Sequence, residues 1–248
     1  MLGLMPRKTV ASGFFRVQML IVLGLAVLAV LAAETGGRVA SAGADPATHA
    51  SWLPLARTWT CIALGVGGFL GSVLWTLERR AAAARLLGGL GALSVFALLV
   101  STSMMSAGST IPGRLDWWSE LATAGSLGGA MTAMLLGHSY LTTPTMSLDP
   151  LKRLNLYFGI AVIVRAIISA IALAFVWNSL NGSTYWMWLS LRWLAGILGP
   201  LVVFVMVQQI LRYRNTQAAT GVLFVGVILT FIGELTAGLL FQELQVPL

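Results

Sequence analysis

The chain has 248 residues, of which 58% are hydrophobic and 9% are charged, and its mean hydropathy is +0.88. Soluble globular domains carry about 25% charged residues, so this composition excludes a soluble protein and predicts an integral membrane protein. At about 20 apolar residues per crossing, the length allows roughly six to eight spans and leaves almost no room for a soluble domain.

Apolar windows separated by charged or turn residues predict seven membrane-spanning helices. We therefore expect an all-α, polytopic transmembrane helical bundle in which residues 1–248 form a single integral membrane domain. Pro200, within the sixth span, is expected to bend that helix. The predicted spans are about 14–33, 56–77, 86–106, 117–139, 151–177, 186–211 and 217–241.

The first predicted span has a second interpretation. Arg7, Lys8 and Arg16 precede an apolar run that ends in the small residues Ala32 and Ala33, and this pattern also fits a cleaved signal peptide. We expect residues 1–33 to be retained, whereas their removal would leave six spans.

Basic residues divide unevenly between the two sides of the predicted bundle. Lys and Arg concentrate in cytoplasmic loops, so ten basic residues against three predict a cytoplasmic N-terminus and an outer C-terminus, as in a bacterial inner-membrane protein. This bias explains the net charge of +7 without a nucleic-acid partner. The predicted inner residues are Arg7, Lys8, Arg16, Arg79, Arg80, Arg85, Lys152, Arg153, Arg212 and Arg214, and the outer ones are Arg38, Arg57 and Arg114.

Aromatic residues follow the same division. An interfacial belt is the favoured interpretation, and a docking surface or the mouth of a ligand pocket is the alternative. Tryptophans fall at predicted outer ends (Trp52, Trp59, Trp117, Trp118, Trp177, Trp186, Trp188), whereas tyrosines fall at inner ends (Tyr140, Tyr157, Tyr213).

Glycines recur where helices are expected to touch. Gly67 and Gly71 lie four residues apart in the second span, and Gly88, Gly89 and Gly91 open the third. Because small residues let helix backbones approach closely in lipid, we expect helix–helix contacts at both groups.

Three ionisable residues fall inside predicted spans, where charged side chains are expensive and mark functional or interhelical sites. Arg165 lies near the middle of the fifth span, with Ser169 one turn further along the same face. Arg192 and Glu234 lie roughly 9 and 6 Å toward the outer leaflet from the centres of their spans, at 1.5 Å per residue. The similar depths permit an ion pair between the sixth and seventh helices.

One carboxylate cannot neutralise two arginines, so a second partner is expected. Candidates are Glu120 at the outer end of the fourth span, backbone carbonyls, a lipid phosphate or a polar ligand such as a quinone, beside which Trp193 would offer a flat apolar surface. Helix pinning, ligand binding and a proton path all remain open as roles for this polar group.

The fourth span carries Glu120 and His138 on one face, 18 residues or about 27 Å apart. We favour the interpretation that Glu120 and His138 are polar groups at opposite membrane surfaces. In the alternative, His138 and Tyr140 form an inner-surface site for a quinone, a proton or haem. Beyond them, Asp149 is expected to cap the fifth helix and Pro150 to occupy its first turn.

Several chemistries are excluded by residue counts. Cys61 is the single cysteine and His49 lies in a predicted outer loop, so neither an iron–sulfur cluster, a zinc site nor a bis-histidine haem is expected within this chain alone. Lys8 and Lys152 both lie at or beyond the predicted inner surface, which excludes a retinal Schiff base in mid-membrane. No self-contained catalytic centre is expected, and whether the chain belongs to an enzyme stays open.

Three functions from different classes fit these features. The first is an integral membrane subunit of a larger respiratory or electron-transfer complex, in which partner subunits carry the redox centres and this chain binds a quinone or lipid near the outer leaflet. The second is an autonomous transporter or proton or ion pathway, and the third is a purely structural membrane scaffold. Candidate ligand-binding or proton-linked residues are Arg165, Arg192, Glu234, Glu120 and Trp193, with His138 and Tyr140 at the inner surface.

Overall fold

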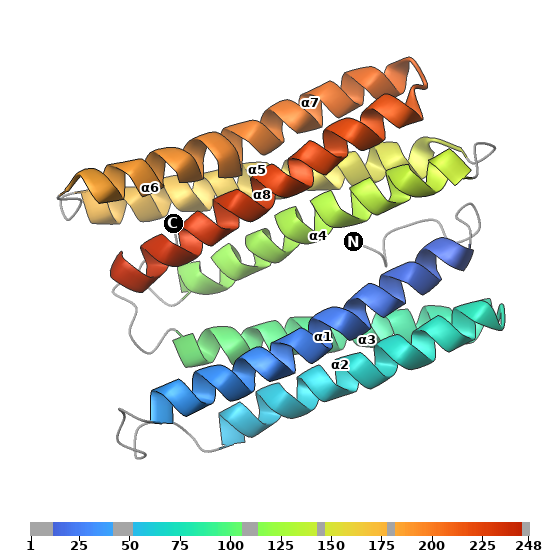
Figure 1. The fold of residues 1–248 in the computed structure, drawn as a ribbon, viewed down its shortest axis with the longest axis horizontal. Helices are drawn as coiled ribbons and strands as arrows, with labels where there is room; N and C mark the ends of the chain where they lie inside the picture. The colour runs from blue at the N-terminus through green and yellow to red at the C-terminus, as the bar shows by residue number, and fades with distance from the viewer. Residues whose placement is uncertain (1–11, 42–51, 106–113, 143–146, 178–181, 245–248) are drawn as a thin grey trace. The chain divides into compact units, whose positions relative to one another are not determined.

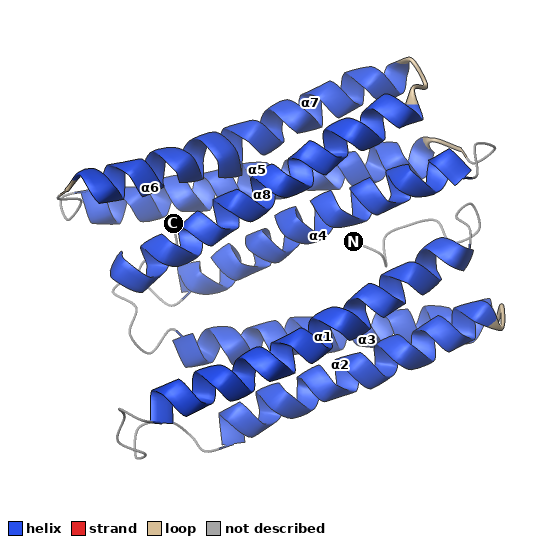
Figure 2. Ribbon diagram, viewed as in Figure 1, coloured by secondary structure: helices blue, strands red, loops and turns tan. Residues whose placement is uncertain are grey.

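A computed structural model describes residues 12–41, 52–105, 114–142, 147–177 and 182–244. These residues are helical apart from short turns and contain no strands (Figure 2). The chain divides into two compact units, one holding helices α1–α3 and the other α4–α8. The relative positions of the two units are not determined, so the expected single domain over residues 1–248 stays a prediction.

Each predicted span corresponds to a helical segment. The bounds are α1 Ser12–Ser41, α2 Trp52–Thr76, α3 Arg80–Met105, α4 Arg114–Thr142, α5 Asp149–Val176, α6 Ser183–Trp193, the π-helical turn η4 Leu194–Leu198, α7 Gly199–Arg212 and α8 Thr216–Leu244. The predicted sixth span is therefore continuous through α6, η4 and α7. A π-helical turn precedes Pro200 in this segment, and the expected bend stays a prediction.

Six of these segments are long and apolar enough to cross a membrane, namely α1, α2, α3, α5, α6 to α7, and α8. Leucine, isoleucine, valine and phenylalanine side chains on them remain exposed, as lipid-facing surfaces require. The chain is thus a helical, multi-pass membrane protein. Helix α4, with 29 residues, is long enough at 1.5 Å per residue, but its serines, threonines and glycines make it less apolar, so a seventh span stays a prediction.

In the α1–α3 unit, α2 packs against both α1 and α3. Phe15 of α1 stacks on Trp75 of α2, with ring centroids 4.4 Å apart. The expected contact at Gly67 and Gly71 is present: a Cβ on Gly71 would lie 2.8 Å from Sδ of Met19, and one on Gly67 would collide with Leu90. Within the α1–α3 unit the similar expectation for Gly88, Gly89 and Gly91 is wrong, because no described residue of that unit lies within 4 Å of an added Cβ there.

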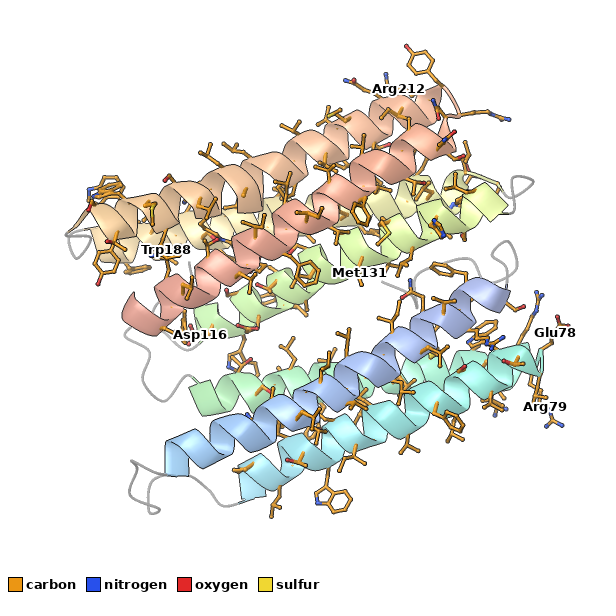
Figure 3. All side chains as sticks on the ribbon, viewed as in Figure 1. Glu78, Arg79, Asp116, Met131, Trp188 and Arg212 are labelled. Atoms are coloured by element: carbon orange, nitrogen blue, oxygen red, sulfur yellow. The ribbon has the colours of Figure 1, made fainter. Side chains whose placement is uncertain are left out.

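In the α4–α8 unit, α8 lies between α4 on one side and α6 and α7 on the other, and α5 packs against α4 and α7 (Figure 1). The first turn of α4, the start of α6 and the last turns of α5 and α8 share one end of this unit, which we call the Asp116 end. Figure 3 shows Asp116 and Trp188 there and Arg212 at the opposite end. Among the predicted outer tryptophans, Trp177 and Trp186 meet edge to face at the Asp116 end, with centroids 5.5 Å apart.

Candidate functional site

A buried ion-pair cluster connects α5, α6 and α8 near the Asp116 end. Arg165 of α5 grips the carboxylate of Glu234 of α8 with two nitrogens: Nε lies 3.3 Å from Oε1 and Nη2 lies 3.2 Å from Oε2. This two-pronged arrangement matches the planar guanidinium to the planar carboxylate and is the strongest geometry available to an Arg–Glu pair. The side chains are only 5% and 10% exposed, respectively.

Arg192 of α6 provides the second guanidinium, and its side chain is fully buried. Its Nη1 donates to Oε1 of Glu234 at 3.0 Å, and its Nη2 donates to Oγ of Ser169 at 3.4 Å. Its Nε is buried and has no hydrogen-bond partner. Arg192 is thus held at one point on Glu234, whereas Arg165 is held at two.

Helix α4 completes the cluster with hydroxyl groups. Thr123 donates its hydroxyl to Oε2 of Glu234 at 3.1 Å, and Ser119 accepts a hydrogen bond of 2.7 Å from Nη1 of Arg165. Both oxygens of Glu234 are therefore fully engaged, each by two donors. Removing this carboxylate would break contacts to three other helices at once.

Close backbone packing between η4 and α8 brings Arg192 to Glu234. A Cβ added to Gly196 would lie 2.7 Å from Cα of Gly233 and 2.9 Å from Nη1 of Arg192, and a Cβ on Gly233 would collide with Cα of Gly196. Only glycine fits at either position, because the two backbones touch. Pro200 accounts for the π-turn, since its ring would collide with the carbonyl of residue 196 in a regular α-helix.

The structure brings together three of the residues singled out in the sequence. The permitted pair of Arg192 and Glu234 is formed, and Arg165 joins it. Glu120 is partly exposed and interacts electrostatically with Arg165 and Glu234. Trp193 is partly buried, and within the described part of the chain it has no hydrogen bond or ring contact to the cluster.

His138 and Tyr140 lie near the other end of α4 and do not reach this cluster. His138 is exposed, whereas Tyr140 is buried and its hydroxyl donates to the carbonyl of Ser147. Tyr140 thus fastens the connection between α4 and α5. The expected cap of α5 is wrong: Leu148 is the N-cap residue without a side-chain hydrogen bond, and Asp149 lies in the first turn, beside Pro150.

Sequence reasoning did not identify Ser119 or Asp116. Asp116 is 4% exposed, and neither of its carboxylate oxygens has a hydrogen-bond partner. Spacing would have revealed both, because residues 116, 119 and 123 lie three and four apart and so share one face of α4. That face is buried against α5 and α8.

Comparison with protein-family models, with curated proteins and with solved structures yields no significant match for this chain. The function must therefore be argued from the cluster itself. Its parts are two guanidiniums, the carboxylate of Glu234 and the hydroxyls of Ser119, Thr123 and Ser169, with the partly exposed Glu120 nearby. Such groups can hold an oxyanion or carbonyl, accept a proton or lock helices together.

Proposed function

We propose that this chain is an integral membrane subunit of a larger respiratory or electron-transfer complex, located in a bacterial inner membrane with its N-terminus in the cytoplasm. In this proposal the cluster of Arg165, Arg192 and Glu234 is the polar site beside which a quinone or a lipid headgroup binds near the outer leaflet. The observation that supports it is the meeting of these three residues from separate helices in one buried group. With one cysteine and two histidines, the chain depends on partner subunits for redox centres.

The contacts suggest a division of roles within this site. A quinone needs donors to its carbonyl oxygens and a nearby proton acceptor. Arg192 offers a donor, since its buried Nε has no partner. Glu234 is already bound by two guanidiniums and Thr123, so we assign it the role of holding the arginines and assign proton acceptance to Glu120.

The first test is isolation of the tagged protein from its own cells in mild detergent, with mass spectrometry of bound proteins, quinones and lipids. Stoichiometric recovery with haem- or iron–sulfur-bearing subunits supports the proposal. Recovery of this chain alone, or only as copies of itself, refutes it.

The second test measures quinone-linked turnover of the isolated complex. Glu120→Gln removes the proposed proton acceptor without touching the ion pairs, so turnover should fall by about 10²- to 10⁴-fold while the complex stays assembled, as expected for the loss of general acid–base catalysis. Asp149→Asn, an exposed carboxylate in the first turn of α5, is the matched control and should leave turnover unchanged. Unchanged turnover in Glu120→Gln would contradict the assignment of Glu120 as the proton acceptor.

A second candidate is an autonomous proton or ion pathway, which is favoured by the buried polar face of α4 that leads from Asp116 to Glu234. Protein reconstituted in vesicles should then carry a proton or solute flux that requires Arg165, and flux that survives Arg165→Ala would contradict this assignment. If substitutions at Arg165, Arg192 and Glu234 lower stability alone, the chain is a structural membrane scaffold.

A further inference from the structure

Asp116 is a buried carboxylate without a hydrogen-bond donor. The residue is 4% exposed, and Oδ1 and Oδ2 are each inaccessible and unpartnered. An ionised carboxylate removed from water costs several kcal/mol unless a donor or a positive charge compensates it. No hydrogen bond from the described residues compensates the burial of Asp116, and its place in the first turn of α4 supplies only the partial positive charge of the helix dipole.

The described hydrogen bonds of Arg165 and Arg192 end on groups other than Asp116. Arg165 of α5 donates to Glu234 and Ser119, and Arg192 of α6 donates to Glu234 and Ser169. None of these hydrogen bonds ends on Asp116 or on Glu120, which lies one turn further along α4. Asp116 thus accepts no hydrogen bond from either guanidinium.

Among the residues whose side chains the structure describes, this region has one positive charge fewer than it has negative charges. Glu120 interacts electrostatically with Arg165 of α5, with Glu234 of α8 and with Asp116. Together with Arg192, these residues comprise two guanidiniums and three carboxylates, so the formal sum is one negative charge. A single monovalent cation would balance the group.

We propose that Asp116 and Glu120 form a binding site for one small monovalent cation at the Asp116 end of the α4–α8 unit. Their i, i+4 spacing places both carboxylates on one side of α4, where their oxygens can share a single positive charge. A proton and an alkali cation satisfy the same chemistry, the first by converting a carboxylate into a donor and the second by coordination to its oxygens. The inference rests on these contacts alone and holds whether or not a quinone binds.

The test is the thermal unfolding midpoint of the purified full-length protein in detergent. One series varies pH at fixed salt, and the other replaces choline chloride with sodium chloride at fixed pH and ionic strength. If a proton is bound only in the folded state, the midpoint falls as pH rises. If sodium is bound, the midpoint rises by about 3–5 °C for each tenfold increase in sodium above its dissociation constant.

Asp116→Asn should abolish whichever dependence the wild type shows, because the amide needs no counter-charge. Asp149→Asn, the exposed control, should keep it. A wild type with neither dependence, or an Asp116→Asn variant with the same dependence, overturns the proposal.

Glu120→Gln provides a second variant should Asp116→Asn fail to fold. It should weaken the dependence, and an unchanged dependence would overturn the shared site. An infrared C=O stretching band of a protonated carboxylic acid that disappears in Asp116→Asn or Glu120→Gln identifies the proton as the ligand. A sodium dependence without this band identifies the alkali cation.

Discussion

Substitution of Gly196 by alanine tests whether backbone contact positions the charge cluster. The new Cβ would lie 2.7 Å from Cα of Gly233 and 2.9 Å from Nη1 of Arg192, whereas ordinary van der Waals contact begins at 3.4 Å. The backbones must therefore separate by about 0.7 Å. A movement of that size directed along the hydrogen bond from Arg192 to Glu234 would lengthen it from 3.0 Å to about 3.7 Å, which is beyond hydrogen-bond range.

The expected cost follows from three contributions. Overpacking costs about 1–3 kcal/mol, and loss of a hydrogen bond between charged groups costs about 1.5–3 kcal/mol. Alanine stabilises a helix by about 0.5–1 kcal/mol relative to glycine, which offsets part of this cost. We expect Gly196→Ala to lower the free energy of unfolding by about 2–5 kcal/mol.

Denaturant unfolding of the purified protein, followed by circular dichroism, measures this free energy. Gly238→Ala in α8 is the control, since nothing lies within 4 Å of its added Cβ, and it should be neutral or slightly stabilising. Arg192→Met should cost less in the Gly196→Ala background than in the wild type, because the ion pair is already broken there. The reasoning would be refuted if Gly196→Ala were as stable as the control. It would also be refuted if Arg192→Met lowered the free energy of unfolding equally in the wild-type and Gly196→Ala backgrounds.

Two further substitutions test contacts elsewhere in the chain. In the α1–α3 unit, Gly68→Ala should lower the free energy of unfolding by about 1–3 kcal/mol, and by more than Gly71→Ala does. The Cβ on residue 68 would lie 2.9 Å from the backbone oxygen of Met19, whereas the Cβ on residue 71 would meet the flexible side chain of Met19. Equal unfolding midpoints for the two variants would contradict this ranking. Tyr140→Phe should cost about 0.5–1.5 kcal/mol, the net value of one hydrogen bond, because water can reach the carbonyl of the exposed Ser147. Faster proteolysis between α4 and α5 would report the loosened connection. Wild-type stability and cleavage would show that this hydrogen bond contributes nothing.

Hydropathy alone located the helices, because in lipid the backbone must satisfy its own hydrogen bonds and few structures other than the helix can do so. Every predicted span overlaps a helix, although α1 continues to Ser41, well past the expected end at 33, and α3 begins at Arg80, before the expected start at 86. The polar residues of α4 leave its status as a span open. The depths of Arg192 and Glu234 followed from the rise per residue and correctly permitted their pairing.

Rotation about the helix axes could not be derived in this way. The face that each helix turns toward its neighbours depends on contacts between segments far apart in sequence, such as the touching backbones of Gly196 and Gly233. For the same reason Gly88 and Gly89 resembled packing sites, but no described residue of their unit lies within 4 Å of an added Cβ there.

The sequence by itself determined that this is a helical membrane protein with expensive charges inside its spans. Only the tertiary structure decided that Arg165 and Arg192 share Glu234, and that Asp116 is buried without a donor. The physical reason is that hydrophobicity and rise per residue are local properties, which fix depth. Whether a buried charge is compensated depends on which side chains lie beside it, and tertiary packing determines those side chains.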